Sequence, residues 1–389
     1  MPHVRTRDLH HRTDRAAVRR RAALSALRRL APGGPPEPRP ADDSSPSEPA
    51  GRSGVTGGDG TPSRRAPDVA PAARRQRTGP AGIRLGRVSD GPARCIAFLG
   101  FGLIAGSVAR ALVAAVDPSA RPLLVGWSPS NAGPEAAVRD GVLDAMAGDP
   151  AAALEGADLV VIGAPPIETV ELVAALGGPL RPALAPDAVI TDLASTKARV
   201  LAAADAASLR FVGGHPMAGR EVTGYGHSLQ DLFTGRPWVL VPSSAADGEA
   251  RDRVAWLAIA CGARPIQMDA GQHDAAVAAI SHLPLVVAAA LAETVAGAEA
   301  ERPGWTAAAP LAASGWRDMT RLARGDARVG AGIAATNSAA LVDGLRALRA
   351  VLDSWIDELA RAGGPDPATL EGRLRAVRDR LEPPPADVA

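Results

Sequence analysis

The chain is poor in the residue types that mark several classes of protein. Aromatic residues make up 3% of its 389 residues, so its core must be built from Ala, Val, Leu and Ile. Its two cysteines, Cys95 and Cys261, are too few for a disulfide framework and lack the spacing of metal ligands. We therefore expect two small buried thiols, no metal site and a reducing, cytoplasmic compartment.

An excess of charge of one sign is also missing. The 43 basic and 42 acidic residues nearly cancel, which gives no case for a nucleic acid or an anionic membrane surface as a partner. The sequence has no uninterrupted apolar run of about 18 residues between anchoring residues. Its arginine-rich start lacks the apolar segment of a secretory signal. We therefore expect no membrane span.

The first 93 residues differ in composition from the rest. Pro, Gly, Ser and Arg dominate up to Pro80, without hydrophobic periodicity. Such a stretch cannot bury enough apolar area to offset the entropy lost on ordering it. The composition predicts a disordered extension over residues 1–93, with a basic interaction tail as the functional alternative.

Short apolar runs alternate with Ala-rich helical stretches from Arg94 onward. This alternation predicts an α/β domain over residues 94–270, with a parallel sheet covered by helices on both faces. The predicted strands are Cys95–Leu99, Pro122–Gly126, Leu159–Gly163, Ala188–Asp192, Phe211–Gly214, Trp238–Pro242 and Ala263–Met268.

The strands stop after about residue 270. Residues 272–300, 305–324 and 327–362 predict long helices with Ala, Leu and Val on one face. We expect an all-helical second domain over residues 271–365, followed by a C-terminal tail, 366–389, that contains a short helix.

A glycine-rich turn follows the first predicted strand. Gly100-Phe-Gly102-Leu103-Ile104-Ala105 matches the G-x-G-x-x-G/A pattern of dinucleotide-binding turns. Gly100 permits a tight turn, Gly102 lets the backbone approach a pyrophosphate, and Ala105 lets the helix pack closely on the strand. Because a strand precedes the turn and a helix follows it, the motif predicts a Rossmann-like dinucleotide-binding domain. A purely structural turn is the alternative.

The second predicted strand bears on the choice of cofactor. Ser128 stands where an acidic residue would bind the ribose of NAD, and no arginine follows it to bind the extra phosphate of NADP. Ser128 could form a hydrogen bond with either group. The residues leave NAD and NADP both open, with NAD preferred.

Polar clusters stand at the ends of two further strands. Ser195, in Asp192-Leu-Ala-Ser195-Thr-Lys197, could cap the next helix or bind substrate. His215 lies between glycines and a proline in Gly213-Gly-His215-Pro-Met-Ala-Gly219. A histidine with a pKa near neutrality can accept the proton of a hydroxyl that is being oxidised, so His215 is the candidate base. A structural histidine is the alternative.

The helical domain carries the remaining candidates. His273 and His282 are nine positions apart, which places them on opposite faces of an ordinary helix and argues against a shared metal ion. Pro284 should kink that helix beside His282. Arg317 and Arg321, four apart, share a helix face and could bind carboxylates. Core histidines and solvated arginines are the alternatives.

Taken in order, these clusters resemble the prephenate dehydrogenase family, which includes the arogenate dehydrogenases. The likeness spans roughly residues 95 to 360. It is carried by the glycine turn, the Asp192–Lys197 cluster, Gly214-His215-Pro-Met-Ala-Gly with Glu221, His273-Asp274, Ser281-His282-Leu-Pro284, and Arg317-Asp318-x-Thr-Arg321.

The resemblance implies an oxidative decarboxylation in tyrosine biosynthesis. Prephenate, or arogenate, would lose hydride to NAD or NADP and its ring carboxylate as CO2. By this likeness His215 polarises the ring hydroxyl with help from Ser195, and the helical domain forms a homodimer. The resemblance assigns substrate binding to Arg321, His282, Arg317, Glu221 and Asp318, the last from the neighbouring subunit.

Three positions depart from the family pattern. Leu285 stands where a second histidine is often found, Val329-Gly330 replaces a bulky aromatic residue, and Ser128 replaces the acidic residue. These departures leave open the preference for substrate and for cofactor. Two other functions remain: a β-hydroxyacid type of dehydrogenase with Lys197 as its catalytic residue, and a nucleotide-binding regulator without turnover.

Overall fold

The computed structural model describes residues 93–297 and 305–382, so the extension expected over residues 1–93 lies outside them except for Ala93. An eight-stranded sheet organises the first domain, in the order β3-β2-β1-β4-β5-β6-β7-β8. The strands are β1 Cys95–Leu99, β2 Leu123–Trp127, β3 Ala145–Met146, β4 Leu159–Ile162, β5 Val189–Asp192, β6 Phe211–Pro216, β7 Pro237–Pro242 and β8 Arg264–Gln267.

The Rossmann-like domain is confirmed, with two differences from the prediction. The two-residue strand β3 was not predicted, because so short a strand leaves no pattern in the sequence. Strand β7 runs antiparallel to β6, whereas the other neighbouring strands in the described sheet are parallel. The segment between β6 and β7 contains only a short 3-10 turn, Tyr225–His227. An antiparallel neighbour needs no helical crossover, so a loop is sufficient there.

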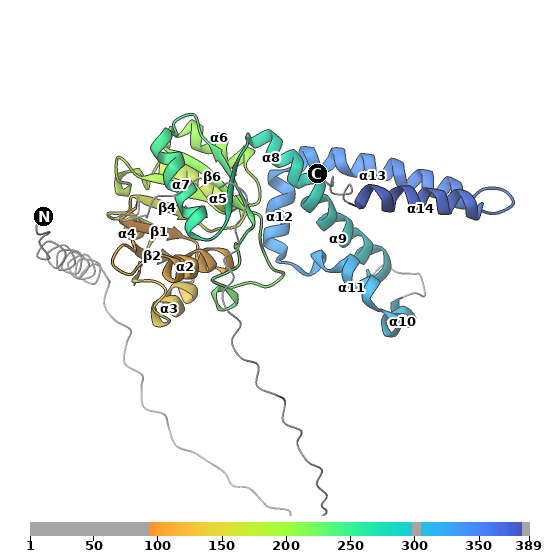
Figure 1. The fold of residues 1–389 in the computed structure, drawn as a ribbon, viewed down its shortest axis with the longest axis horizontal. Coiled ribbons are helices and arrows are strands. Elements are labelled where there is room, and N and C mark those ends of the chain that lie inside the picture. The colour runs from red at the N-terminus through yellow and green to blue at the C-terminus, as the bar shows by residue number, and fades with distance from the viewer. Residues whose placement is uncertain (1–92, 298–304, 383–389) are drawn as a thin grey trace, which may run out of the picture. The chain divides into compact units, whose positions relative to one another are not determined.

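Helices cover both faces of the sheet (Figure 1). Alternate residues of β1 point to opposite sides: Ile96 and Phe98 lie in one core, and Ala97 and Leu99 in the other. The first core is closed by α2 Leu103–Ala115, α3 Ala132–Arg139 and α7 Gly248–Ala260. The second is closed by α4 Pro150–Leu154, α5 Pro166–Gly177 and α6 Ala198–Ala206.

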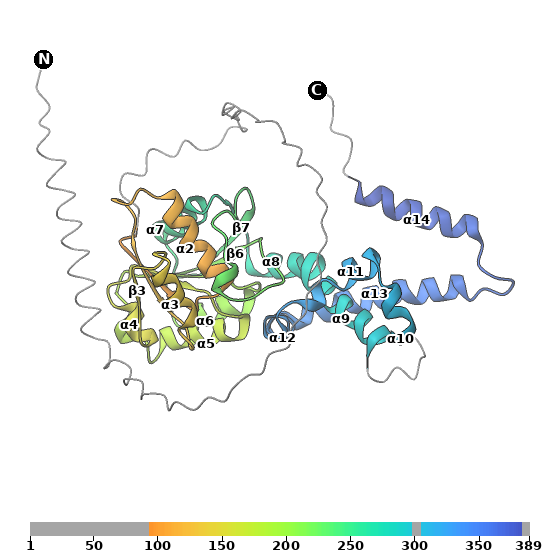
Figure 2. The ribbon, with the colours of Figure 1, turned by 90° about the horizontal axis from the view of Figure 1, so that it is seen from below.

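The second domain is helical, and Figure 2 shows its helices α9 to α13 grouped together. Its helices are α8 Ala270–Val277, α9 Leu283–Ala296, α10 Trp305–Ala308, α11 Ser314–Thr320, α12 Ala327–Thr336, α13 Ser338–Leu359 and α14 Pro367–Leu381. The helix predicted over 305–324 is divided at a 3-10 turn containing Pro310, which lacks a backbone N–H. The helix predicted over 327–362 is divided at Asn337, whose backbone is not helical.

A π-helical turn, Ala278–His282, joins α8 to α9. Pro284 follows it directly and occupies the first turn of α9. The predicted disturbance beside His282 therefore takes the form of a π turn rather than an open kink. Such turns are often found at functional sites, because they reorient the side chains that flank them.

The stretch Ala270–Ala296 contains an 18-residue window with a mean hydropathy of 2.1, so it is long and apolar enough to cross a membrane on those two criteria. The sequence predicted no such span, because His273, Asp274 and His282 interrupt the apolar run. All three of these polar side chains are buried against other parts of the protein. By contrast, Ala288 is the only fully buried residue of α9, and the larger apolar side chains of that helix are half-buried in one chain.

Candidate active site

The glycine turn after β1 requires glycine for two separate reasons. Gly100 has φ +87°, in the left-handed region, and a Cβ there would lie 2.9 Å from the carbonyl carbon and oxygen of Gly163. A Cβ on Gly163 would lie 2.7 Å from the Cβ of Ala105. The turn, strand β4 and helix α2 can therefore approach this closely only with these small residues.

The other side of the turn is open. A Cβ on Gly102 would meet no atom within 4 Å. Gly102 caps α2 without a side-chain hydrogen bond, and the first turn of α2, which includes the buried Leu103 and the half-buried Ile104, has no acidic residue. The free backbone N–H groups at this end of the 13-residue helix α2 suit a pyrophosphate. The turn therefore fits a bound dinucleotide.

Ser128 follows β2 at the place where the adenosine ribose is expected. Its backbone N–H donates to Oδ1 of Asn131 over 2.9 Å, and the side-chain amide of Asn131 donates to the carbonyl of Ala147 over 3.1 Å. The turn is thus held by an amide, and residues 128–131 contain neither a carboxylate nor an arginine. The choice between NAD and NADP stays a prediction.

His215 lies at the carboxyl end of β6 and faces a second histidine. Its Nδ1 is 2.8 Å from Nε2 of His273, on helix α8 of the second domain. Nδ1 of His273 is in turn 2.7 Å from Oδ1 of Asp274. The hydrogen bonds leave Nε2 of His215 without a partner among the described residues.

Asp274 also caps helix α6 of the first domain. Its Oδ1 accepts from the backbone N–H of Lys197 over 2.8 Å, and its Oδ2 from that of Ala198 over 2.9 Å. The alternative in which Ser195 caps this helix is therefore wrong, because the capping carboxylate comes from the other domain. Ser195 is half-buried and makes no side-chain hydrogen bond within residues 93–297 and 305–382. Its contact with a substrate stays a prediction.

Burial determines the charge states of this pair. Burial lowers the pKa of His215 well below its ordinary value of 6.5, and electrostatic interactions with His273, Lys197 and His282 lower it further. Burial by itself raises the pKa of Asp274, but hydrogen bonds from His273 and from two backbone amides outweigh it, so the net pKa is lowered. At neutral pH Asp274 is an anion, and His215 is neutral and able to accept a proton.

A buried ion pair holds the strand ends around His215. Lys197 and Asp192 are both fully buried and form an ion pair. Asp192 also accepts from the backbone N–H of Gly214, next to His215, over 3.0 Å. Burial lowers the pKa of Lys197, and Asp192 counteracts this shift. Because the ammonium group of Lys197 is already bound to Asp192, it is poorly placed to act as the catalytic residue of a β-hydroxyacid type of dehydrogenase.

His282 is 1% exposed and meets Asn337, at the break between α12 and α13. The side-chain nitrogen of Asn337 donates to the carbonyl of Asp274 over 2.8 Å and lies 3.2 Å from Nδ1 of His282. Because a carbonyl only accepts, this side-chain atom is the NH2 group, and Nδ1 of His282 must accept from it. Burial lowers the pKa of His282 to about 4, so the ring is neutral and its proton is on Nε2.

That Nε2–H group of His282 is buried and has no hydrogen-bond partner among residues 93–297 and 305–382. A buried donor without an acceptor costs about 1–3 kcal/mol, so such groups in a site are commonly satisfied by a ligand or an ordered water. The structure thus places a neutral donor near the histidine pair. The π turn and Asn337 connect His282 and Asp274 within one network, although ordinary helical spacing placed His273 and His282 on opposite faces.

The predicted carboxylate-binding residues are only partly brought together. Arg321, at the end of α11, forms an ion pair with Glu221, in the loop six residues after His215. Arg317 is exposed and donates to its own helix over 3.4 Å. Asp318 is exposed, and its carboxylate makes no hydrogen bond within the described parts of the chain. Arg321 and Glu221 therefore adjoin the His215 loop, whereas roles for Arg317 and Asp318 stay predictions.

The sequence did not reveal the parts of the site that connect the two domains. The adjacent His273 and Asp274 were noticed as a motif, but their contacts with His215 and α6 join positions 58 and 76 apart. Asn337, which joins Asp274 and His282 within the second domain, lay inside a predicted continuous helix and gave no signal. Thr196 and Thr336, whose hydroxyl oxygens are 2.8 Å apart, complete the junction.

A dinucleotide-binding first domain, a helical second domain and a hydrogen-bonded pair of histidines between them define a two-domain nicotinamide-dependent dehydrogenase. The sequence profile of "Prephenate dehydrogenase, nucleotide-binding domain" matches residues 119–267, and that of "Prephenate dehydrogenase, dimerization domain" matches residues 269–365. The chain belongs to the prephenate dehydrogenase family.

Individual relatives agree with this assignment. The chain is 30% identical to a prephenate dehydrogenase of Bacillus subtilis over 267 residues, which is 68% of each chain. It is 31% identical to a cyclohexadienyl dehydrogenase of Zymomonas mobilis over 268 residues, 68% of this chain and 86% of the relative. The crystal structure of Synechocystis arogenate dehydrogenase matches 74% of this chain and 99% of its own, with a TM-score of 0.59 and 30% identity.

The two glycines of the turn should respond differently to alanine. Gly100→Ala should lower the stability of the protein by about 1–3 kcal/mol, because it adds a clash with Gly163 to an unfavourable backbone angle. Gly102→Ala should leave stability nearly unchanged and weaken dinucleotide binding, because its Cβ would enter the open space. Thermal unfolding and a fluorescence titration with NADH distinguish the two effects. Equal stability of both variants would contradict this account of the turn.

Proposed function

We propose that the chain catalyses the oxidative decarboxylation of prephenate, or of arogenate, with transfer of hydride to NAD or NADP. The observation that carries the proposal is the neutral imidazole of His215, whose Nδ1 is hydrogen-bonded and whose Nε2 is free at the carboxyl edge of the sheet. Ligands bind at this edge in Rossmann-like domains. The family and its prephenate- and arogenate-named members support the choice of substrate.

The bound nicotinamide ring supplies the hydride acceptor. Nε2 of His215 takes the proton of the ring hydroxyl as hydride leaves the carbinol carbon. Loss of the ring carboxylate as CO2 then makes the ring aromatic, and the proton returns to the oxygen. The product is 4-hydroxyphenylpyruvate from prephenate, or tyrosine from arogenate. The protein's main task is to position the hydroxyl and begin its deprotonation.

The substrate's anionic groups need donors, because the net charge of +1 gives the chain no broad positive field. Arg321 binds a carboxylate of the substrate, and Glu221, its present partner, holds it in place until then. The buried Nε2–H of His282 donates to a second oxygen of the substrate, while Ser195 holds the hydroxyl. Arg317 and the partner subunit's Asp318 also take part in binding the substrate.

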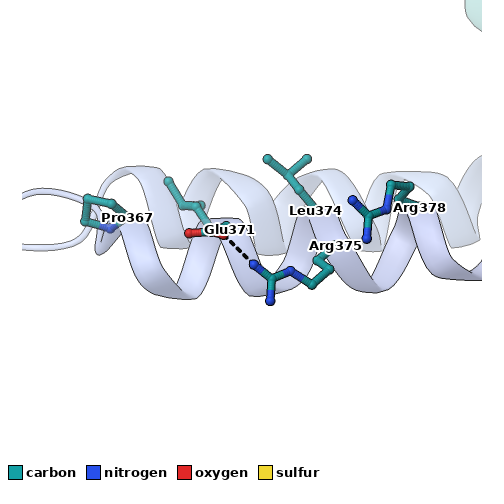
Figure 3. A pocket seen from close by; sticks show the side chains of 6 residues that line it. Pro367, Glu371, Leu374, Arg375 and Arg378 are labelled. Atoms are coloured by element: carbon teal, nitrogen blue, oxygen red, sulfur yellow. Dashed lines mark hydrogen bonds and ion pairs between the residues drawn. The ribbon is translucent and has the colours of Figure 1, made fainter.

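The second domain forms a homodimer in this proposal. Helix α9 buries only Ala288, and α14 buries no residue at all. Helix α14 follows α13 in the chain, and its Arg373 lies 4.0 Å from the ring centre of Trp355 on α13. A shallow hollow of about 510 Å³ lies along α14, and Figure 3 shows that its lining includes Leu374, Glu371 and Arg375. The apolar side chains on these helices need a second copy to cover them.

The two cysteines bear on the compartment in which the enzyme works. Burial raises the pKa of Cys95 to about 12 and also raises that of Cys261, so neither thiol is reactive. Inert thiols without a disulfide agree with a cytoplasmic enzyme that acts on a small molecule.

The proposal is tested by assaying the purified chain with prephenate and arogenate, each with NAD and NADP, at 340 nm. Turnover is expected in at least one combination. His215→Asn should lower kcat by about 100- to 10,000-fold, the usual contribution of a general base, and change KM little. Failure of the wild-type chain in all four combinations would refute the proposed function.

Arg321→Ala should raise KM for the substrate about 10- to 100-fold, because it removes a charged hydrogen bond to a carboxylate. Arg324→Ala, at an exposed arginine three positions further along the chain, is the matched control, and its KM should change less than threefold. A KM that is unaltered in Arg321→Ala but raised in Arg317→Ala would transfer the carboxylate contact to Arg317.

Ile356, on α13, is 61% exposed, and Ile356→Glu should separate the homodimer, because it would bury a carboxylate in an apolar interface. Val138→Glu, on α3 of the first domain, is the control, because Val138 is 38% exposed and lies outside the proposed interface. Sedimentation equilibrium should show a dimeric wild type and control. A monomeric wild type would contradict the assembly.

A further inference from the structure

The hydrogen-bond chain behind His215 ends on a carboxylate of the other domain. The rings of His215 and His273 meet edge-on, with centroids 5.1 Å apart and planes at 74°. This geometry suits an N–H···N hydrogen bond between Nδ1 of one ring and Nε2 of the other, which are 2.8 Å apart. His273 is 1% exposed, so water does not compete for these atoms.

The direction of each hydrogen bond follows from the last acceptor. Ionised Asp274 can only accept, so Nδ1 of His273 carries a proton. In a neutral His273 ring, Nε2 is then bare and accepts from Nδ1–H of His215. The proton of neutral His215 is thereby on Nδ1, and its Nε2 is the free acceptor. The opposite arrangement, in which Nε2 of His273 donates to Nδ1 of His215, would require a second proton and hence a positive charge on the ring of His273.

We propose that His273 and Asp274 are positioning residues for the dehydrogenation, which hold His215 in the tautomer whose Nε2 accepts the substrate's hydroxyl proton. This inference rests on the proposed function. The O–H bond of the substrate breaks and an Nε2–H bond forms, which gives His215 a positive charge. Its Nδ1–H then donates more strongly to His273, and Asp274 stabilises the charge through that ring. The proton returns to oxygen when the ring becomes aromatic, so no further reactant is needed.

Among the charged groups around His215, Asp274 is the carboxylate that can stabilise a positive charge on its ring. Three groups near His215 can carry a positive charge: Lys197, and the rings of His273 and His282 when these are protonated. Asp192 is paired with Lys197 and bonded to the backbone of Gly214. Asp274 is the carboxylate hydrogen-bonded to His273 in the described structure, and it also fixes the distance between the two domains by capping α6.

Two substitutions of one residue separate this role from packing. In His273→Asn the shorter amide can still reach Asp274 but not His215, whereas in His273→Gln the longer amide can offer an oxygen to Nδ1 of His215. We expect kcat to fall about 100-fold in His273→Asn and about 10-fold or less in His273→Gln, with KM for substrate and NAD within about threefold of wild type. Equal losses of kcat in the two variants, or none, would overturn the proposal.

The pH profile provides a second readout if His273→Asn does not fold. The base works unprotonated, so kcat/KM falls as the pH drops through the pKa of His215. Asp274→Asn removes the negative charge that stabilises protonated His215, which lowers this pKa. The acid limb should move to lower pH and the plateau should fall. An acid limb that stays in place would refute the proposal, whereas an inactive wild type would refute the proposed function instead.

Discussion

The site depends on one buried carboxylate, that of Asp274. It accepts two backbone N–H groups at the start of α6 and a third hydrogen bond from the ring of His273, and it is 5% exposed. Removing any one of these partners would leave a desolvated charge incompletely paired, which is costly in a protein interior. The carboxylate therefore fixes how the helical domain sits on the dinucleotide-binding domain. It also fixes His273, and through His273 the imidazole of His215.

The same junction gives two histidines opposite roles. The series of hydrogen bonds from His215 through His273 to Asp274 makes Nε2 of His215 an acceptor. The amide of Asn337, by contrast, makes Nε2 of His282 a donor. Both rings are kept neutral mainly by burial. A substrate with a hydroxyl to be deprotonated and carboxylates to be held needs one group of each kind. Tautomers rather than charges thus distinguish the two sides of the proposed pocket.

The sequence predicted what local patterns determine. The strand–turn–helix at Gly100 to Ala105 could be predicted because a tight turn needs a glycine locally, and the φ of +87° at Gly100 confirms this need. The close approach of Gly100 to Gly163, 63 positions away, had no local signal. The antiparallel β7 was missed because strand direction depends on a loop without a pattern. The cap of α6 was missed for a related reason: Ser195 fits the local rule, but the carboxylate comes from 76 positions away. Asn337 could not be found, since its two contacts, with Asp274 and His282, exist only once the helices of the second domain have packed together.

The tautomers themselves can be measured, and they test the account most directly. Nitrogen-15 NMR of histidine-labelled protein at neutral pH distinguishes a protonated from a bare ring nitrogen, and the chain has only seven histidines to assign. The account predicts a proton on Nδ1 and a bare Nε2 in His215, with the reverse in His282. A proton on Nε2 of His215 in the resting protein would contradict it.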